Sequence, residues 1–218
     1  MRKRKAPMQI AIVVFDRFTA LDAVGPYETL GRLPGSETVF VAERRGPVRT
    51  DTGNLAVTAD RTLAEVPHPD IVVVAGGPGQ TPQMENEVLL DWLRTADATS
   101  TWTTSVCTGS LLLAGAGLLR GRRATSHWLA VGHLERFGAV PTAERVVTDG
   151  KYVTAAGVSA GIDMGLTLLG RIAGDEHAQG VQLAVEYDPQ PPYDSGSPRK
   201  APAHLVERFR SRSRFALS

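Results

Sequence analysis

Two short stretches of the chain are almost entirely apolar, and they constrain its fold more than any other feature. They are Gln9–Phe15, with the sequence QIAIVVF, and Ile71–Ala75. Strands that are apolar on both faces are typical of a parallel sheet with helices packed on both sides. The rest of the chain alternates short apolar runs with amphipathic segments. We therefore predict an α/β fold, a flavodoxin-like doubly wound sandwich with a mostly parallel central sheet.

The other segments of the chain fit this alternation. Turn signals predict a small hairpin over Val48–Val57, and a second hairpin in which Arg145–Asp149 turns at Asp149-Gly150. Further strands are expected at Thr38–Ala42, Thr101–Val106, Ala124–His127 and Tyr152–Ala155. Helices are expected at Leu21–Leu33, Asn86–Ala98, Ala130–Phe137, Ala160–Ala173, Asp175–Val185 and, in the tail, His204–Phe209.

The composition suits one domain with a substantial core, because 42% of the 218 residues are hydrophobic and the formal net charge is +1. We assign the domain to residues 8–198. Residues 1–7, with Arg2, Lys3, Arg4 and Lys5, are expected to form a basic disordered arm, and residues 199–218 a basic tail on the surface. Nothing in this pattern indicates nucleic-acid binding.

The location of the protein is predicted from what the chain lacks. No apolar run approaches the length of a membrane span, and the N-terminus lacks the apolar core of a secretory signal. We predict a cytoplasmic protein with no membrane partner, in which a single thiol can stay reduced.

Cys107 is the only cysteine, so it cannot form a disulfide within the chain. It stands where the strand-like run Thr101–Val106 meets a helix-like run, and Thr108, Gly109 and Ser110 follow it. Such small residues allow the sharp strand-to-helix turn called a nucleophile elbow. The helix N-terminus would favour the thiolate. The alternative is a buried cysteine that only packs as a small hydrophobe.

Three other segments could converge on this thiol. Asp22 lies near the start of a helix that follows the first strand, where it could cap the helix or, beside the thiol, exchange protons with a raised pKa. Gly76 and Gly77 follow a strand and could form a turn or offer backbone N–H groups as an oxyanion hole. Thr108 could cap its helix and also bind a polar group through its N–H and hydroxyl.

The histidines give a weaker signal. His127, which precedes Trp128, could pair with Cys107 as a dyad or line the pocket wall, and the sequence supplies no distance to decide. The other histidines show no metal-type spacing to each other or to Cys107. We expect neither a metal nor a cofactor.

The motifs LDAVGPYE, IVVVAGGPG, SVCTGSLLLAGAGLL, ATSHW and AAGVSAGIDMGL occur in this order along the chain. Together they resemble the ThiJ/PfpI superfamily, which has the class I glutamine amidotransferase-like fold, from about Met8 to Pro198. Cys107-Thr108-Gly109, the acid Asp22 and the tail motif VEYDPQPPYDSGSP resemble its isonitrile hydratase branch in particular. The resemblance implies a homodimer that adds water to an isocyanide and releases an N-substituted formamide through a cysteine thioimidate, without a cofactor.

That resemblance also implies roles for the candidate residues. Cys107 would be the nucleophile, Asp22 the proton shuttle and Thr108 the residue that helps to hold the water. Gly76 and Gly77 would steady charge on the adduct, and His127 and Trp128 would lie at the substrate.

The departures from other branches of the superfamily also matter. PfpI-type proteases carry histidine where this chain has Thr108, and the branch of the Parkinson-associated protein carries glutamate where it has Asp22. AraC-type regulators with this fold add a helix-turn-helix region, and we expect no separate DNA-binding domain here. Two alternatives stay open: a glyoxalase-like or deglycase-like enzyme that uses Cys107 with His127, and a non-enzymatic redox or ligand sensor based on Cys107.

Overall fold

A seven-stranded sheet forms the centre of the protein in the computed structural model, which describes residues 7–215. The strand order is β10-β11-β7-β6-β1-β2-β5, and every neighbouring pair is parallel except β10 with β11. The predicted basic residues Arg2–Lys5 lie outside the described part of the chain. The strands are β1 (Met8–Val13), β2 (Ser36–Ala42), β5 (Arg61–Thr62), β6 (Ile71–Val74), β7 (Trp102–Val106), β10 (Val146–Asp149) and β11 (Tyr152–Ala155).

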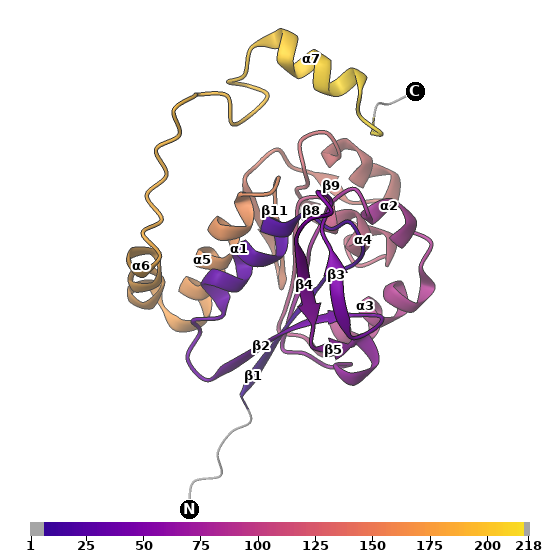
Figure 1. Ribbon diagram of the computed structural model, residues 1–218, viewed down its shortest axis with the longest axis vertical. Helices are drawn as coiled ribbons and strands as arrows, with labels where there is room; N and C mark the ends of the chain where they lie inside the picture. Colours follow the sequence, from indigo (N-terminus) through magenta and orange to yellow (C-terminus); the bar gives the residue numbers. More distant parts are fainter. Residues whose placement is uncertain (1–6, 216–218) are drawn as a thin grey trace, which may run out of the picture.

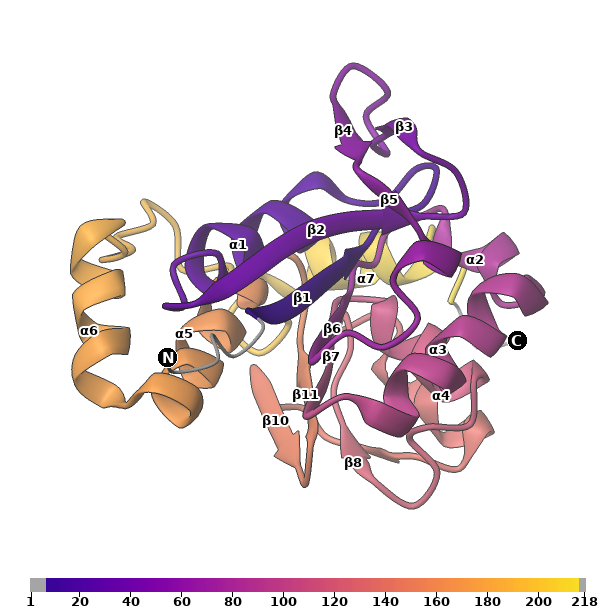
Figure 2. The same ribbon diagram turned by 90° about the horizontal axis from the view of Figure 1, so that it is seen from below.

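Helices cover both faces of this sheet (Figure 2). On one face lie α1 (Ala20–Leu30) and α5 (Ala160–Ala173), which pack against each other, with α6 (Asp175–Ala184) outside α5. On the other face lie α3 (Glu87–Thr99) and α4 (Gly109–Gly115). This arrangement confirms the predicted doubly wound sandwich, and the apolar β1 and β6 are buried at its centre as their composition required.

The register of the parallel strands decides where side chains can meet. Val13 of β1 is paired with Val74 of β6, Val74 with Ser105 of β7, and Val106 with Ala155 of β11. The segments that follow β1, β6, β7 and β11 therefore leave the sheet at one edge. In such folds this edge is where sites are built.

Short elements complete the domain. The predicted hairpins are confirmed as β3 (Gly46–Arg49) with β4 (Ala56–Ala59), and as β10 with β11. Four elements were not predicted, because a few residues carry no periodic signal: β5, β9 (Val140–Pro141), the 3-10 turn η1 (Leu63–Glu65) and α2 (Gln80–Gln83).

Two predicted elements differ from the structure. The strand expected at Ala124–His127 is only β8 (Arg123–Ala124), which pairs with β9 outside the main sheet, and the N–H of Thr125 then donates to the Thr154 hydroxyl (2.9 Å). The helix expected at Ala130–Phe137 is the 3-10 helix η2 (Val131–Phe137).

The C-terminal segment ends in α7 (Ala203–Ser211), close to the range that the sequence predicts. In Figure 1 this helix lies beyond the carboxyl ends of the parallel strands, at the opposite end of the molecule from β1's start. None of its residues is buried. Between residues 7 and 215, no helix combines the length and the apolar character that crossing a membrane would require.

Candidate active site

Cys107 occupies a strained turn between β7 and α4. Its φ of 57° lies in the left-handed region, which non-glycine residues rarely adopt. Its N–H lies within hydrogen-bond distance of the carbonyls of Ala155 (3.1 Å) and Ala156 (2.9 Å), and its carbonyl accepts from the hydroxyls of Ser110 (3.1 Å) and Ser126 (3.0 Å). Both peptide groups of the turn are thus held in place. The strand-to-helix elbow that the small residues predicted is present.

Asp22 reaches this turn from the first turn of α1 and is fully buried. Its Oδ2 accepts a hydrogen bond from the N–H of Gly76 (2.9 Å), across the edge of the sheet. The other oxygen, Oδ1, has no hydrogen-bond partner of good geometry within residues 7–215, and the carboxyl interacts with the Cys107 thiol. The carboxyl makes no capping hydrogen bond to its own helix, although it lies in the first turn of α1, where the helix dipole favours negative charge.

The two groups have unusual proton affinities because both are buried. Burial raises the pKa of Asp22 to about 7, against the lowering effects of the Gly76 N–H and the thiol, and the negative charge of Asp51 raises it further. Burial and the negative charge of Asp22 raise the pKa of Cys107 well above its ordinary value, although backbone N–H groups of Val158 and Thr108 lower it. The pair therefore retains at least one proton at neutral pH.

This result corrects the expectation that the helix N-terminus makes the resting thiolate dominant. Cys107 is only 5% exposed, and loss of hydration outweighs the two N–H groups at the sulfur. The anionic sulfur is therefore a state reached when the proton moves. The Asp22 carboxyl is placed to exchange that proton.

Gly76 and Gly77 are at the site, but their N–H groups already have partners. The Gly76 N–H donates to Asp22 and the Gly77 N–H donates to Oγ1 of Thr108 (2.9 Å). A Cβ on Gly76 would lie 2.5 Å from the backbone nitrogen of Thr108 and 2.9 Å from Oδ2 of Asp22, so only glycine permits this approach. In this geometry the two glycines orient the acid and the threonine, whereas the sequence suggested free oxyanion donors.

Thr108 stands at the N-cap position of α4, yet its side chain makes no capping hydrogen bond. Its hydroxyl instead accepts from the Gly77 N–H and lies 3.3 Å from the Gly77 carbonyl oxygen. The loop after β6 and the residue after the nucleophile are thus joined directly.

Val158 supplies a contact that the sequence analysis missed. Its backbone N–H lies at the Cys107 sulfur, and its φ of 38° shows a second unusual backbone conformation in the loop after β11. The only sequence signal is its position after Gly157, directly beyond a strand that ends at this edge of the sheet. The donors at the sulfur are therefore Val158 and Thr108.

His127 lies next to the elbow, but within residues 7–215 it makes no hydrogen bond to the Cys107 thiol. Its Nδ1 accepts a hydrogen bond from the Leu129 N–H (3.3 Å), and its ring packs on Gly157 and lies 5.9 Å from the Trp128 ring. Burial and the positive charge of Arg214 lower its pKa. A Cys–His dyad has no hydrogen bond to support it within residues 7–215, and His127 fits a wall position.

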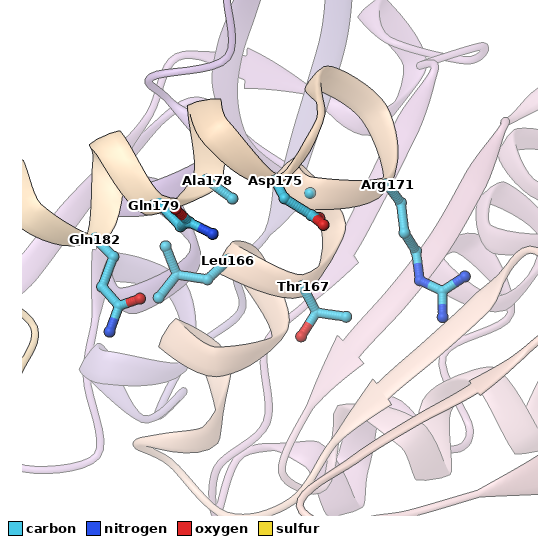
Figure 3. Close-up of a pocket in the computed structure, with 8 residues that line it drawn as sticks. Leu166, Thr167, Arg171, Asp175, Ala178, Gln179 and Gln182 are labelled. Atoms are coloured by element: carbon cyan, nitrogen blue, oxygen red, sulfur yellow. The ribbon is translucent and has the colours of Figure 1, made fainter.

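Hollows elsewhere in the described residues, between α5 and α6 and at the end of β1, are not lined by these site residues. Across residues 7–215, no group of three or more His, Cys, Asp or Glu side chains is arranged to hold a metal ion. A hollow of about 440 Å³ lies between α5 and α6 (Figure 3), and none of the candidate residues lines it. The candidate site is therefore the cluster of Cys107, Asp22, Thr108, Gly76 and Gly77.

Comparisons with known proteins agree with this fold. The sequence pattern of the DJ-1/PfpI family matches residues 8–171. The chain is 44% identical to an isonitrile hydratase of Pseudomonas putida over 206 residues, which cover 94% of this chain and 90% of that protein. It is 35% identical to the transcriptional regulator CdhR of Pseudomonas aeruginosa, over 66% of this chain and 41% of the regulator. A crystal structure of a ThiJ/PfpI family protein from Pseudomonas syringae superposes with a TM-score of 0.91 at 37% identity, over 96% of this chain and 89% of that one.

Proposed function

We propose that this chain, which belongs to the DJ-1/PfpI family, is an isonitrile hydratase that converts an isocyanide and water into an N-substituted formamide. The observation that carries the proposal is the buried pair of Cys107 and Asp22, beside Thr108, in a chain 44% identical to an isonitrile hydratase over nearly its full length. That pair offers one soft nucleophile and one proton shuttle. Isocyanide hydration requires both.

The chemistry of the substrate matches the properties of this pair. The terminal carbon of an isocyanide carries a lone pair and is also electrophilic, so it accepts a proton and a nucleophile at the same atom. An apolar molecule of this kind fits a site from which water is largely excluded. Because Cys107 and Asp22 are buried, their pKa values are raised, and the pair keeps a proton at neutral pH that it can give to such a carbon.

In the first step the sulfur of Cys107 bonds to the terminal carbon, and that carbon receives the proton held by the pair, through Asp22. The product is the thioimidate R–N=CH–S–Cys107, with Asp22 left as carboxylate. The N–H groups of Val158 and Thr108 lie at the sulfur and stabilise its negative charge before the bond forms. A raised Asp22 pKa of about 7 suits a group that gives and then takes a proton near neutral pH.

In the second step Asp22 takes a proton from a water molecule and passes it to the substrate nitrogen, while the resulting hydroxide bonds to the thioimidate carbon. The C–S bond then breaks and releases R–NH–CHO, and the proton of the new hydroxyl group returns to the thiol through Asp22. We assign to Thr108 the placement of this water, because Thr108 directly follows the nucleophile and the Gly77 loop holds its hydroxyl in a fixed position. Isocyanide and water account for every atom of the formamide.

The two alternatives have less support. A glyoxalase-like or deglycase-like reaction was tied to Cys107 acting with His127, and His127 bonds instead to the Leu129 N–H. A redox sensor needs an exposed thiol of low pKa, whereas Cys107 is buried and its pKa is raised. The homodimer and the cytoplasmic location stay predictions from the sequence.

The test is formamide production from cyclohexyl isocyanide by the purified protein. We expect turnover by the wild type and a fall of about 10²-fold or more in Cys107→Ala and in Asp22→Asn. Thr108→Ser, which keeps the hydroxyl, should retain more activity than Thr108→Val. Asp16→Asn, which changes an exposed carboxyl, is the matched control and should behave as the wild type.

Two results would overturn the proposal. Full turnover by Asp22→Asn would leave the mechanism without its proton shuttle. No formamide from aliphatic or aromatic isocyanides, together with consumption of methylglyoxal, would assign the site to reactive carbonyls instead.

A further inference from the structure

An arginine from the C-terminal segment reaches the candidate site. Arg214 lies three residues beyond the end of α7, and its Nη2 donates to the Gly77 carbonyl (2.9 Å) while Nη1 donates to the Pro78 carbonyl (2.6 Å). Gly77 is the residue whose N–H donates to the Thr108 hydroxyl. The guanidinium therefore binds the same loop that orients Thr108, from a part of the sequence that composition marked only as a charged tail.

The charge of Arg214 also acts on the site. Burial lowers the pKa of Arg214, a negative charge on Cys107 raises it, and the positive charge of Arg17 lowers it. Because an interaction between two charges is reciprocal, the guanidinium in turn favours the thiolate form of Cys107. His127 responds to the same cation, since the charge of Arg214 lowers its pKa.

The residue after Arg214 fixes the segment on the other side. The Phe215 ring lies 4.6 Å from the guanidinium carbon of Arg214 and 5.4 Å from the ring of His133, and the Phe215 carbonyl lies 3.1 Å from Nε2 of His133. His133 belongs to η2. The end of the tail is thus held between η2 and the loop after β6, which gives Arg214 a defined position.

We propose that Arg214 is a positioning residue of the Cys107 site, which holds the Gly77–Pro78 loop in place and supplies positive charge beside the reacting sulfur. The need for such a charge follows from the burial of the site. When the proton moves from Cys107 to Asp22, the sulfur carries a negative charge at a buried position, where loss of hydration opposes it. The positive charge of Arg214, which interacts with that of the sulfur, offsets part of this cost. The inference rests on the proposed function for its catalytic meaning, but its test requires no turnover.

The test uses the fact that Cys107 is the only thiol in the protein. Iodoacetamide and iodoacetate are close in size and differ in charge, so the ratio of their alkylation rates reports the electrostatic potential at Cys107. At low salt we expect the iodoacetate-to-iodoacetamide ratio to fall about threefold or more in Arg214→Gln. Arg214→Lys, which keeps the charge, should retain most of the ratio. Arg212→Gln, an exposed arginine of the same segment, should leave it unchanged.

The ratio separates this role from a merely structural one. If Arg214 only covers the site, its loss will change both alkylation rates by the same factor, and the proposal is wrong. An unchanged ratio in Arg214→Gln with a native circular dichroism spectrum also overturns it. Formamide assays then test the function separately: where the wild type is active, Arg214→Gln should lower kcat more than it changes KM, and Arg214→Lys should restore part of kcat. If the wild type has no hydratase activity but the iodoacetate-to-iodoacetamide ratio falls in Arg214→Gln, the role of Arg214 is supported and the proposed reaction is rejected.

Discussion

Replacing Asp22 with asparagine should make the protein more stable, and the gain should grow with pH. The carboxyl is fully buried, and its pKa rises from 3.8 to about 7 on folding. A group whose pKa is higher in the folded state binds its proton more tightly there. Between about pH 4 and pH 7 the carboxyl ionises in the unfolded chain but stays protonated in the folded protein. The free energy of unfolding therefore falls as the pH rises through this range.

The size of the effect follows from the shift. A rise of about three pKa units corresponds to a penalty of about 4 kcal/mol well above pH 7. At pH 5, which is little more than one unit above the ordinary pKa, the same relation gives a penalty of only about 1.5 kcal/mol. Asparagine has nearly the same shape and keeps an oxygen that can accept from the Gly76 N–H. The variant should therefore gain about 2.5 kcal/mol more at pH 8 than at pH 5.

The assay is urea unfolding of the wild type and Asp22→Asn at both pH values. Comparing the two proteins cancels the titration of every other group, so only the double difference is interpreted. Asp16→Asn, at an exposed carboxyl, should show no such pH-dependent difference. If Asp22→Asn is destabilising by the same amount at pH 5 and pH 8, the carboxyl is ionised in the folded protein at both, and the reasoning about the Cys107–Asp22 proton is refuted.

Three further predictions concern the packing of the elbow and of the contact between α1 and α5. Gly165→Ala should lower the urea midpoint, because its Cβ would lie 1.9 Å from Oγ1 of Thr29, where α5 meets α1. Gly180→Ala is also helical but has no atom within 4 Å of the added Cβ, so it should raise stability by about 1 kcal/mol. Equal effects of the two substitutions would contradict this account. Cys107→Gly should be more stable than Cys107→Ala by about 1 kcal/mol in thermal melts, because only glycine adopts a φ of 57° without strain; the reverse order would show that the elbow is unstrained. Gly76→Ala should abolish formamide production while Cys107 stays open to alkylation, since the added Cβ displaces the residue after the nucleophile; unchanged turnover would exclude a tight approach there.

The sequence was most informative where a local pattern has a single structural solution. The apolar runs at β1 and β6 required burial on both faces, and the small residues after Cys107 allowed a sharp turn. The sequence could also predict that Asp22 lies near the thiol, because the carboxyl ends of neighbouring parallel strands meet at one edge of the sheet. The short elements, such as α2 and β9, carried no periodic signal to find.

Sequence reasoning failed where the answer depended on which polar groups already had partners. The sequence left Gly76 and Gly77 as either a turn or a source of free oxyanion donors, and in the structure both N–H groups donate within the site. Val158 acts through its backbone, which leaves no mark in its residue type. The sequence left open whether His127 pairs with Cys107 or lines the pocket wall, because the partner of its Nδ1, the Leu129 N–H, could not be read from spacing.

The sequence by itself determined the layered fold, the place of Cys107 at a strand-to-helix turn and the candidate acid at Asp22, because hydrophobic periodicity and chain connectivity act over neighbouring residues. Only the tertiary structure decided the protonation of that pair and the arrival of Arg214, which lies 137 residues from its partner Gly77. Both are consequences of burial and of contacts between distant segments. Desolvation and charge depend on what surrounds a group in three dimensions, and that information appears only when the chain is folded.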